Sequence, residues 1–199
     1  LLIDNCILVN SDEEVIHCDS DGYGTVTNTL INGGRFGVKV GSDGGGSMIV
    51  INSTITNVTD LAIWISHGSN IEITNLILAD NGGDLNWWTG EPNSISINYT
   101  DIDGYPFEDG EFSCGGDDYC SGSNNISNNP QFTDPDNGDF TLQSTSPCID
   151  AGDPESDPDP DGTIADMGAY YYDQIANPII WGCMDEEACN YDSEATVDE

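Results

Sequence analysis

The chain has 199 residues, of which 37 are Asp or Glu and only 2 are Lys or Arg, so its formal net charge is -35. Such a charge repels nucleic acid phosphates and anionic membrane surfaces, and no apolar run approaches the roughly 18 residues of a membrane span, which excludes nucleic acid binding and membrane insertion. The self-repulsion of so many carboxylates makes a divalent cation the first ligand to expect.

The first hundred residues contain an internal repeat. Four segments share the pattern apolar-x-Asn/Ser-x-apolar, at spacings of 23, 25 and 22 residues: 3–7, 26–30, 51–55 and 73–77. A second short strand is expected after each of them, at 15–18, 38–40, 63–65 and 85–87. The alternation of apolar and polar residues within the segments is typical of β-strands.

A coil of about 23 residues cannot bury its apolar face alone, whereas coils stacked about 4.8 Å apart share one continuous core. We therefore predict an all-β fold, a parallel β-helix over residues 1–104. No window has apolar residues at the i, i+3, i+4 and i+7 positions of an amphipathic helix. A β-sandwich is the alternative, but it does not explain the repeat period.

The central polar residues of the repeats are expected to stack in one file inside the column. These residues are Asn5, Asn28, Ser53 and Asn75. A buried polar side chain is costly unless it forms hydrogen bonds, and stacking lets each one bond to backbone or to its equivalent in the next coil.

A register built on asparagine alone would use Asn52 in the third coil and Asn98 in the fifth. We reject it at the third coil, because a one-residue slip would turn Ile51 and Ile55 outward. The fifth segment, 95–99, departs from the pattern and is expected to end the regular coils.

Residues 105–176 are predicted to form a disulfide loop followed by an irregular, loop-rich C-terminal cap. Cys114 and Cys120 flank a Gly- and Asp-rich sequence that suits a disulfide of an oxidising compartment, and Cys183 and Cys189 flank a second such segment. Zinc is the alternative, but neither pair has the CxxC spacing. Residues 129–153 regain apolar residues between turns and are expected to cover the open end of the solenoid.

A resemblance rests on two runs of this region, NPQFTDPDNGDFTLQSTSPCIDAGD at 129–153 and DPDGTIADMGAY at 159–170. They resemble the closing segment of secreted bacterial proteins of the pectin-lyase-like superfamily, and the likeness covers roughly residues 1–173. It implies a right-handed β-helix and a secreted, extracellular or cell-surface location. Residues 177–199 resemble a short Cys-containing module of exported bacterial surface proteins, but the sequence stops before the Asp-Gly-Ser-Cys that closes the module in those relatives.

Two acidic loops are candidate calcium sites, because alternating aspartates place carboxylates on one side of a tight turn. The stronger candidate comprises Asp157, Asp159, Asp161, Thr163 and Asp166. It is not an EF-hand, because Gly168 stands where the bidentate Glu would be. The weaker candidate comprises Asp134, Asp136 and Asp139. The alternative for both is a solvated acidic turn.

The superfamily resemblance also raises the possibility of a polysaccharide lyase, in which a basic residue removes a proton from an acidic sugar. Arg35 and Lys39 are the only Lys or Arg residues of the chain. Their spacing does not define a site, and a pair of surface charges is the alternative. No Ser-His-Asp arrangement is recognisable, and we predict no catalytic residue.

The outward positions of the second strands are expected to form a ligand or subunit face. They stack His17, Lys39, Trp64 and Asn86, with Trp88 beside them. A tryptophan on a flat solenoid face can carry a sugar ring or a second subunit. Ordinary packing beneath a loop is the alternative.

These features favour a non-catalytic, calcium-stabilised extracellular protein with a structural or adhesive role, such as a filament subunit that stacks head to tail or a fragment of a large adhesin that contacts other surface proteins. The alternative is a polysaccharide-binding or polysaccharide-degrading β-helix protein with a glycan as its ligand.

Overall fold

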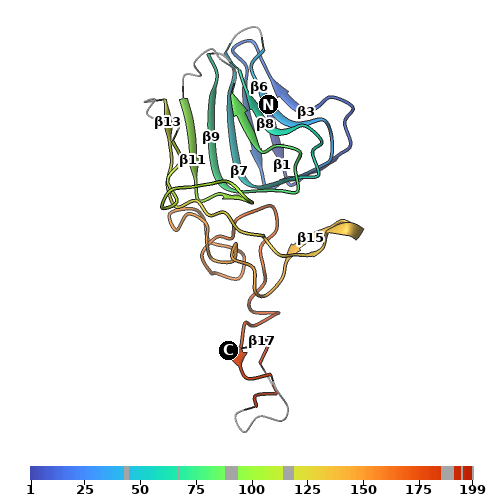
Figure 1. The fold of residues 1–199 in the computed structure, drawn as a ribbon, viewed down its shortest axis with the longest axis vertical. Helices are drawn as coiled ribbons and strands as arrows, with labels where there is room; N and C mark the ends of the chain where they lie inside the picture. The colour runs from blue at the N-terminus through green and yellow to red at the C-terminus, as the bar shows by residue number, and fades with distance from the viewer. Residues whose placement is uncertain are drawn as a thin grey trace.

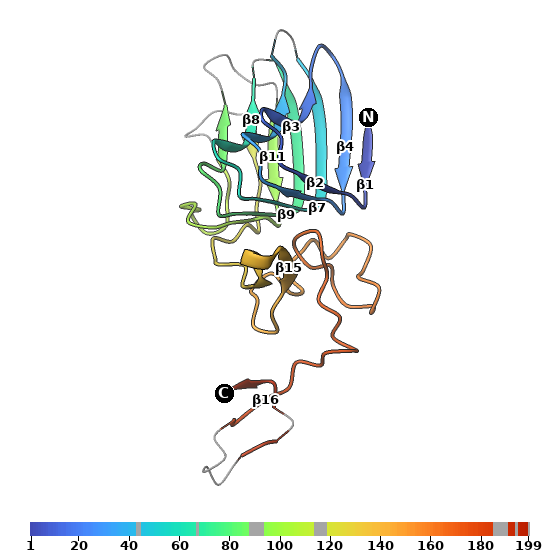
Figure 2. The same ribbon diagram turned by 90° about the vertical axis from the view of Figure 1, so that its right-hand side faces the viewer.

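A computed structural model describes residues 1–42, 45–66, 68–87, 94–113, 119–184, 191–193 and 195–198. It confirms the all-β prediction, because parallel strands stack as a β-solenoid of about five turns. The only helix of the described residues is the short 3-10 helix Pro135–Asn137. Figures 1 and 2 show the stacked strands as the upper body, with the C-terminal chain below it.

Two parallel sheets form the column. The larger has nine described strands: β1 (Leu2–Asp4), β2 (Ile7–Val9), β4 (Tyr23–Thr27), β5 (Leu30–Asn32), β7 (Ser47–Thr56), β9 (Asn70–Ala79), β11 (Ser94–Asn98), β12 (Asp101–Ile102) and β13 (Cys120–Ser121). The smaller has the order β10-β8-β6-β3 and comprises β3 (Glu14–Cys18), β6 (Phe36–Val40), β8 (Leu61–Ile65) and β10 (Leu85–Trp87). Outside the column lie the antiparallel pair β14 (Phe132–Asp134) and β15 (Asp139–Leu142), and the parallel pair β16 (Trp181–Gly182) and β17 (Val197–Asp198).

Each coil of the larger sheet bends at one residue with a positive φ. These residues are Asn5 (φ 54), Asn28 (φ 48), Asn52 (φ 46), Asn75 (φ 54) and Tyr99 (φ 47). Asparagine tolerates this left-handed conformation better than most residues with a side chain, which explains its recurrence at the bend.

The predicted register was wrong in the third coil. Ile51 pairs with Thr74 and Ser53 with Leu76, so Asn52 lies beside Asn75 at the bend. Ile51 is half-buried on the outer face while Ile55 is fully buried. A left-handed residue between them interrupts the alternation of a strand, so the slip turns one isoleucine outward and not both.

The asparagines form a ladder along this corner, with all but the last less buried than predicted. Asn28 Nδ2 donates to Asp4 Oδ1 (3.0 Å), Asn52 Nδ2 to Asn28 Oδ1 (3.4 Å), and Asn75 Nδ2 to Asn52 Oδ1 (2.9 Å). Asn5 is exposed and Asn28 and Asn52 are half-buried, whereas Asn75 is fully buried. Ser53 lies inside the column, where its hydroxyl accepts a hydrogen bond from Thr29 N (3.2 Å).

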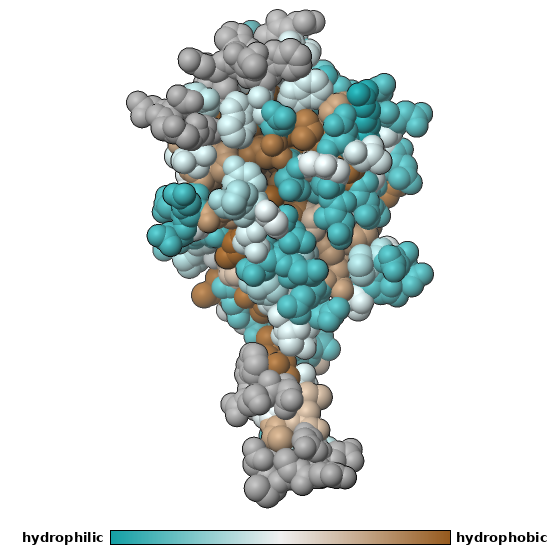
Figure 3. Space-filling view, viewed as in Figure 1, coloured by the Kyte–Doolittle hydropathy of each residue, from teal (hydrophilic) through white to brown (hydrophobic). Residues whose placement is uncertain are grey.

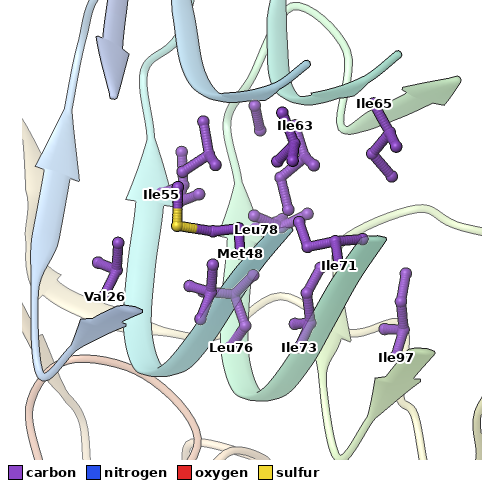
Figure 4. Packing of buried hydrophobic residues seen from close by; sticks show 14 of the residues in the cluster. Val26, Met48, Ile55, Ile63, Ile65, Ile71, Ile73, Leu76, Leu78 and Ile97 are labelled. Atoms are coloured by element: carbon purple, nitrogen blue, oxygen red, sulfur yellow. The ribbon is translucent and has the colours of Figure 1, made fainter. Parts of the chain in front are cut away.

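Aliphatic side chains from both sheets fill the column. Figure 4 shows Ile71, Ile73, Leu76 and Leu78 of β9 directed into the space that Ile63 and Ile65 of β8 also fill. All of these side chains are at most 2 % exposed. Full burial of such a side chain contributes about 1.5–3 kcal/mol, so the stacked core dominates the stability of the fold.

The C-terminal end of the column is covered by residues 105–113. The buried Phe112 joins the main core, its backbone N–H donates to Gly122 O (3.0 Å), and its ring lies edge-on to Trp87 at a centroid distance of 6.3 Å. Asn125 donates its backbone N–H and its side-chain amide to Gly110 O, at 3.0 Å each. These bonds satisfy part of the last open sheet edge.

Residues 129–173 do not cover this end as expected but pack along the flank of several coils. Leu30, Ile77 and Ala79, which face outward from the larger sheet, share a cluster with Phe132, Phe140, Leu142, Cys148 and Met167. Ala169 N donates to Thr54 Oγ1 (3.0 Å) and Gly168 N to Asn75 O (2.9 Å). The outward apolar residues explain the difference, because they also need cover from water. We call residues 129–173 the flank segment.

Candidate functional site

The stronger acidic loop lies within the flank segment, where its carboxylates accept backbone hydrogen bonds. Asp166 Oδ1 accepts from Asp150 N and Asp166 Oδ2 from Tyr172 N, at 2.7 Å each. Asp159 Oδ2 accepts from Asp166 N (2.8 Å), and Asp161 Oδ2 accepts from Gln174 N (2.9 Å). These aspartates therefore fold the segment back on itself.

The carboxylates of this loop differ in their proton affinity. Burial raises the pKa of Asp166 to about 7, with repulsion from Asp159 and Asp150 adding to the effect. Burial also raises the pKa of Asp159. Hydrogen bonds lower the pKa of Asp161, and the one from the Thr163 hydroxyl has the largest effect. A bound cation would relieve the repulsion, because an opposite charge favours the ionised form of each carboxylate.

Calcium at this loop stays a prediction. In the part of the chain that the structure describes, no group of three or more His, Cys, Asp or Glu side chains is arranged to hold a metal ion. Asp157 is exposed, and Thr163 donates its hydroxyl to Asp161 Oδ1 (2.7 Å). A calcium ion here would take several of its ligands from backbone carbonyls and water, both of which it accepts.

The weaker acidic loop forms the turn between β14 and β15. Asp134 pairs with Asp139 across the hairpin, and Asp136 lies in the 3-10 helix between them. Asn137 Nδ2 donates to Asp134 Oδ2 (2.8 Å), and Thr141 donates its hydroxyl to Asp139 Oδ1 (2.6 Å). All three aspartates are exposed, so this loop has the solvated geometry of the alternative reading, and calcium here remains a prediction.

A buried acid that the sequence reasoning missed joins the column to the flank segment. Asp101 is fully buried, and it accepts Asn128 N at Oδ1 (2.9 Å) and the Cys148 thiol at Oδ2 (3.3 Å). Burial raises the pKa of Asp101 to about 6 and also raises the pKa of the Cys148 thiol. A buried thiol kept protonated is unreactive, so this contact is structural.

The predicted file on the smaller sheet is confirmed in register. His17 pairs with Lys39, Lys39 with Trp64, and Trp64 with Asn86, whereas Trp88 lies outside the described residues. Lys39 Nζ lies 2.6 Å from Glu14 Oε1 and 4.9 Å from the centre of the Trp64 ring. Lys39 and Trp64 are half-buried, and His17 and Asn86 are exposed at either side.

The single Lys and the single Arg of the chain both form ion pairs with carboxylates. The Lys39 and Glu14 side chains are only 16 % and 21 % exposed, which makes their ion pair a fixed contact. Arg35 lies 3.3 Å from Glu13 and 3.5 Å from Asp60. Both positive charges are therefore paired with carboxylates of the same chain.

The cysteines are only partly described. Cys120 is disulfide-bonded, and Cys114, its predicted partner, lies outside the described residues. Cys183 is a half-buried free thiol, which contradicts its predicted pairing with Cys189, a residue outside the described ones, whereas the pairing of Cys114 with Cys120 stays a prediction. The other free thiols of the described chain belong to Cys6, Cys18 and Cys148.

No protein-family model, no curated protein and no solved structure matches the chain. No helix of the described residues is long and apolar enough to cross a lipid bilayer.

Proposed function

We propose that the chain is a non-catalytic structural or adhesive part of a secreted or cell-surface protein. The observation that carries this proposal is that its Lys and Arg side chains form ion pairs with carboxylates. Arg35 and Lys39 are the only Arg and Lys residues of the sequence, so this pairing counts against either of them as the base of a lyase reaction. What remains is a stiff column of stacked strands with a largely hydrophilic surface on the face in Figure 3.

Calcium is proposed to stabilise this protein. The support is a charge of -35 together with two carboxylates of raised pKa, Asp159 and Asp166, in one loop of the flank segment. A cation that binds only the folded state stabilises it by mass action. The resemblance of the flank segment to secreted bacterial β-helix proteins supports an extracellular, calcium-rich setting.

Self-association through the N-terminal edge is proposed as the adhesive contact. The edge strands β1 and β2 expose Leu2 (71 %), Ile7 (63 %) and Val9 (56 %). An exposed apolar strand edge is a template for a further strand. For two copies to stack head to tail, residues 105–113 of one copy would have to move from the opposite end, because Phe112 occupies it. Another surface protein that supplies a strand would need no such movement.

The test is an assay for lyase activity. The oligomeric state of the same sample is measured beside it, because self-association is part of the proposal. Purified chain is incubated with polygalacturonate and alginate in calcium, and formation of unsaturated uronide is followed by ultraviolet absorbance. We expect no product. Product that disappears in the Lys39→Ala or Arg35→Ala variant would refute the non-catalytic proposal.

A glycan-binding protein is the second candidate, and the in-register file of His17, Lys39, Trp64 and Asn86 supports it. The packing of this file limits what it can offer. The Trp64 ring lies 5.0 Å from the ring of Phe36 and beneath the Lys39 ammonium, so one part of it is already covered. Loss of oligosaccharide binding in Trp64→Ala would support this face as the site.

A further inference from the structure

A groove between the β14–β15 hairpin and residues 171–177 combines an aromatic ring with hydrogen-bonding groups. Its volume is about 650 Å³, within the range of small-molecule sites. The residues that line it are Thr133, Thr141, Leu142, Gln143, Ser144, Tyr171, Tyr172, Asp173 and Asn177. They come from the β14–β15 hairpin and from the chain that follows the acidic loop, two stretches far apart in the sequence.

One wall of the groove is the outer face of the hairpin. Phe132 and Phe140 pack inward with their rings edge-on at 5.3 Å, and the alternating Thr133 and Thr141 are therefore exposed. Thr141 Oγ1 lies 3.1 Å from Thr133 Oγ1, so the two hydroxyls lie side by side. A hairpin anchored by two aromatic rings holds these hydroxyls in a fixed position.

The other wall presents Tyr171. Its neighbours Tyr170 and Tyr172 pack against the apolar cluster of the flank segment, and Tyr172 N is fixed to Asp166 Oδ2 (2.7 Å). Alternation along this extended stretch leaves Tyr171 39 % exposed. Its ring is therefore available on a backbone that is held in place.

Several polar groups of the groove have no partner within the described chain. Asp173 uses Oδ1 to accept from Ile175 N (3.0 Å) and Ala176 N (2.8 Å), which leaves Oδ2 uncommitted. The Asn177 side-chain amide and the Ser144 hydroxyl also lack a hydrogen bond among the described residues. An amide, a hydroxyl and a carboxylate can together donate to and accept from vicinal hydroxyl groups.

Two further grooves of the described chain differ from this one in their lining. The groove beside the end-covering loop also has an aromatic ring, Tyr105, but its polar groups are mainly the carboxylates of residues 108, 109 and 111. The groove beside Asp80 and Asp103 has amide side chains, but its one aromatic residue, Phe132, is buried. The charge of -35 opposes an anionic ligand anywhere on the surface. Asp173 and the nearby Asp139 add to that repulsion at this groove.

We propose that this groove binds a neutral saccharide, with one sugar ring stacked on Tyr171 and its hydroxyls bonded to Asn177, Asp173 and Ser144. The apolar C–H face of a sugar ring fits the face of an aromatic side chain, while its hydroxyls need the polar groups around the rim. The inference rests on the glycan-binding candidate for its ligand class. It places the ligand on the flank segment and not on the Trp64 face.

The test measures binding of neutral hexasaccharides by isothermal titration calorimetry. The probes are β-linked hexasaccharides of glucose, xylose and mannose, with hexagalacturonate as the anionic comparison. We expect at least one neutral hexasaccharide to bind and hexagalacturonate not to bind. Tyr171→Ala should weaken the association about tenfold or more through loss of the stacking surface, whereas Tyr171→Phe should stay within about threefold.

Matched variants separate the two faces. Asn177→Ala should weaken binding about threefold to tenfold, while Tyr23→Ala, at a 57 % exposed tyrosine of the column, and Trp64→Ala should leave it unchanged. Binding kept in Tyr171→Ala but lost in Trp64→Ala overturns the groove and supports the other face. No binding of any neutral hexasaccharide overturns both, and equal binding of hexagalacturonate overturns the neutral ligand class.

Discussion

Asn75 joins the asparagine ladder to the flank segment, and its replacement by alanine should be costly. The side chain is fully buried, donates to Asn52 Oδ1 (2.9 Å) and accepts from Asp153 N (2.7 Å). Both partners are half-buried, and each one left unsatisfied costs about 1–3 kcal/mol. The left-handed backbone at φ 54 adds about 1 kcal/mol for alanine. We expect Asn75→Ala to lower the free energy of unfolding by about 4 kcal/mol.

Two further variants divide this loss into its causes. Asn75→Gly keeps the backbone conformation without strain and loses the same hydrogen bonds, so it should cost about 3 kcal/mol. Asn5→Ala has the same backbone strain (φ 54) at an exposed position and should cost about 1 kcal/mol. Urea unfolding followed by tryptophan fluorescence gives the three values. An Asn75→Ala variant no less stable than Asn5→Ala would refute the ladder as an energetic link.

Three other predictions concern charge, metal and thiols. Burial raises the pKa of Asp101 from 3.8 to about 6, so the stability that its protonated form contributes is complete below pH 3.8 and is lost as the pH rises through 6. In urea titrations, the stability of Asp101→Asn relative to the parent should therefore increase by up to about 3 kcal/mol between about pH 4 and pH 7.5. A difference that stays constant with pH would contradict the raised pKa. Calcium at about 100 times its dissociation constant should stabilise the chain by about 2.7 kcal/mol, an effect that chelator removes and Asp159→Asn weakens in thermal melts; melting temperatures that ignore calcium would speak against the metal. Cys183 should react with a thiol reagent in the native state and the fully buried Cys148 only after unfolding, as mass spectrometry of the labelled peptides would show; native labelling of Cys148 would contradict its contact with Asp101.

The repeat pattern predicted the strands and their stacking because each coil of a solenoid needs the same residue types at equivalent positions, so the pattern recurs once per coil. The file from His17 to Asn86 followed directly, since equivalent positions of stacked coils must be neighbours. The prediction of the polar ladder was wrong in the third coil. Period-two reasoning holds only while the strand is straight, and the left-handed Asn52 bends the chain within the ten-residue β7.

The flank segment was beyond the reach of the same reasoning. Its sequence has no repeat period, so no local sequence pattern indicates whether the segment covers the end or the side of the column. The deciding residues, Leu30, Ile77 and Ala79, are outward-facing apolar positions of the coils themselves, and their file is visible only once the register is right. The groove that we propose as a saccharide site was missed for a related reason, because Thr133 and Asn177 come to line one groove only through the packing of that segment.

The account depends most on the parallel, in-register stacking of the coils at the corner. Isotope-edited NOESY spectra of the labelled chain test it through the backbone protons of Ile51, Thr74 and Asn98, which occupy one file in three successive coils. We expect contacts of the parallel type from Ile51 to Thr74 and from Thr74 to Asn98. Short Hα–Hα contacts of antiparallel strands, or contacts that align Ser53 with Asn75, would contradict the stacking described for this column.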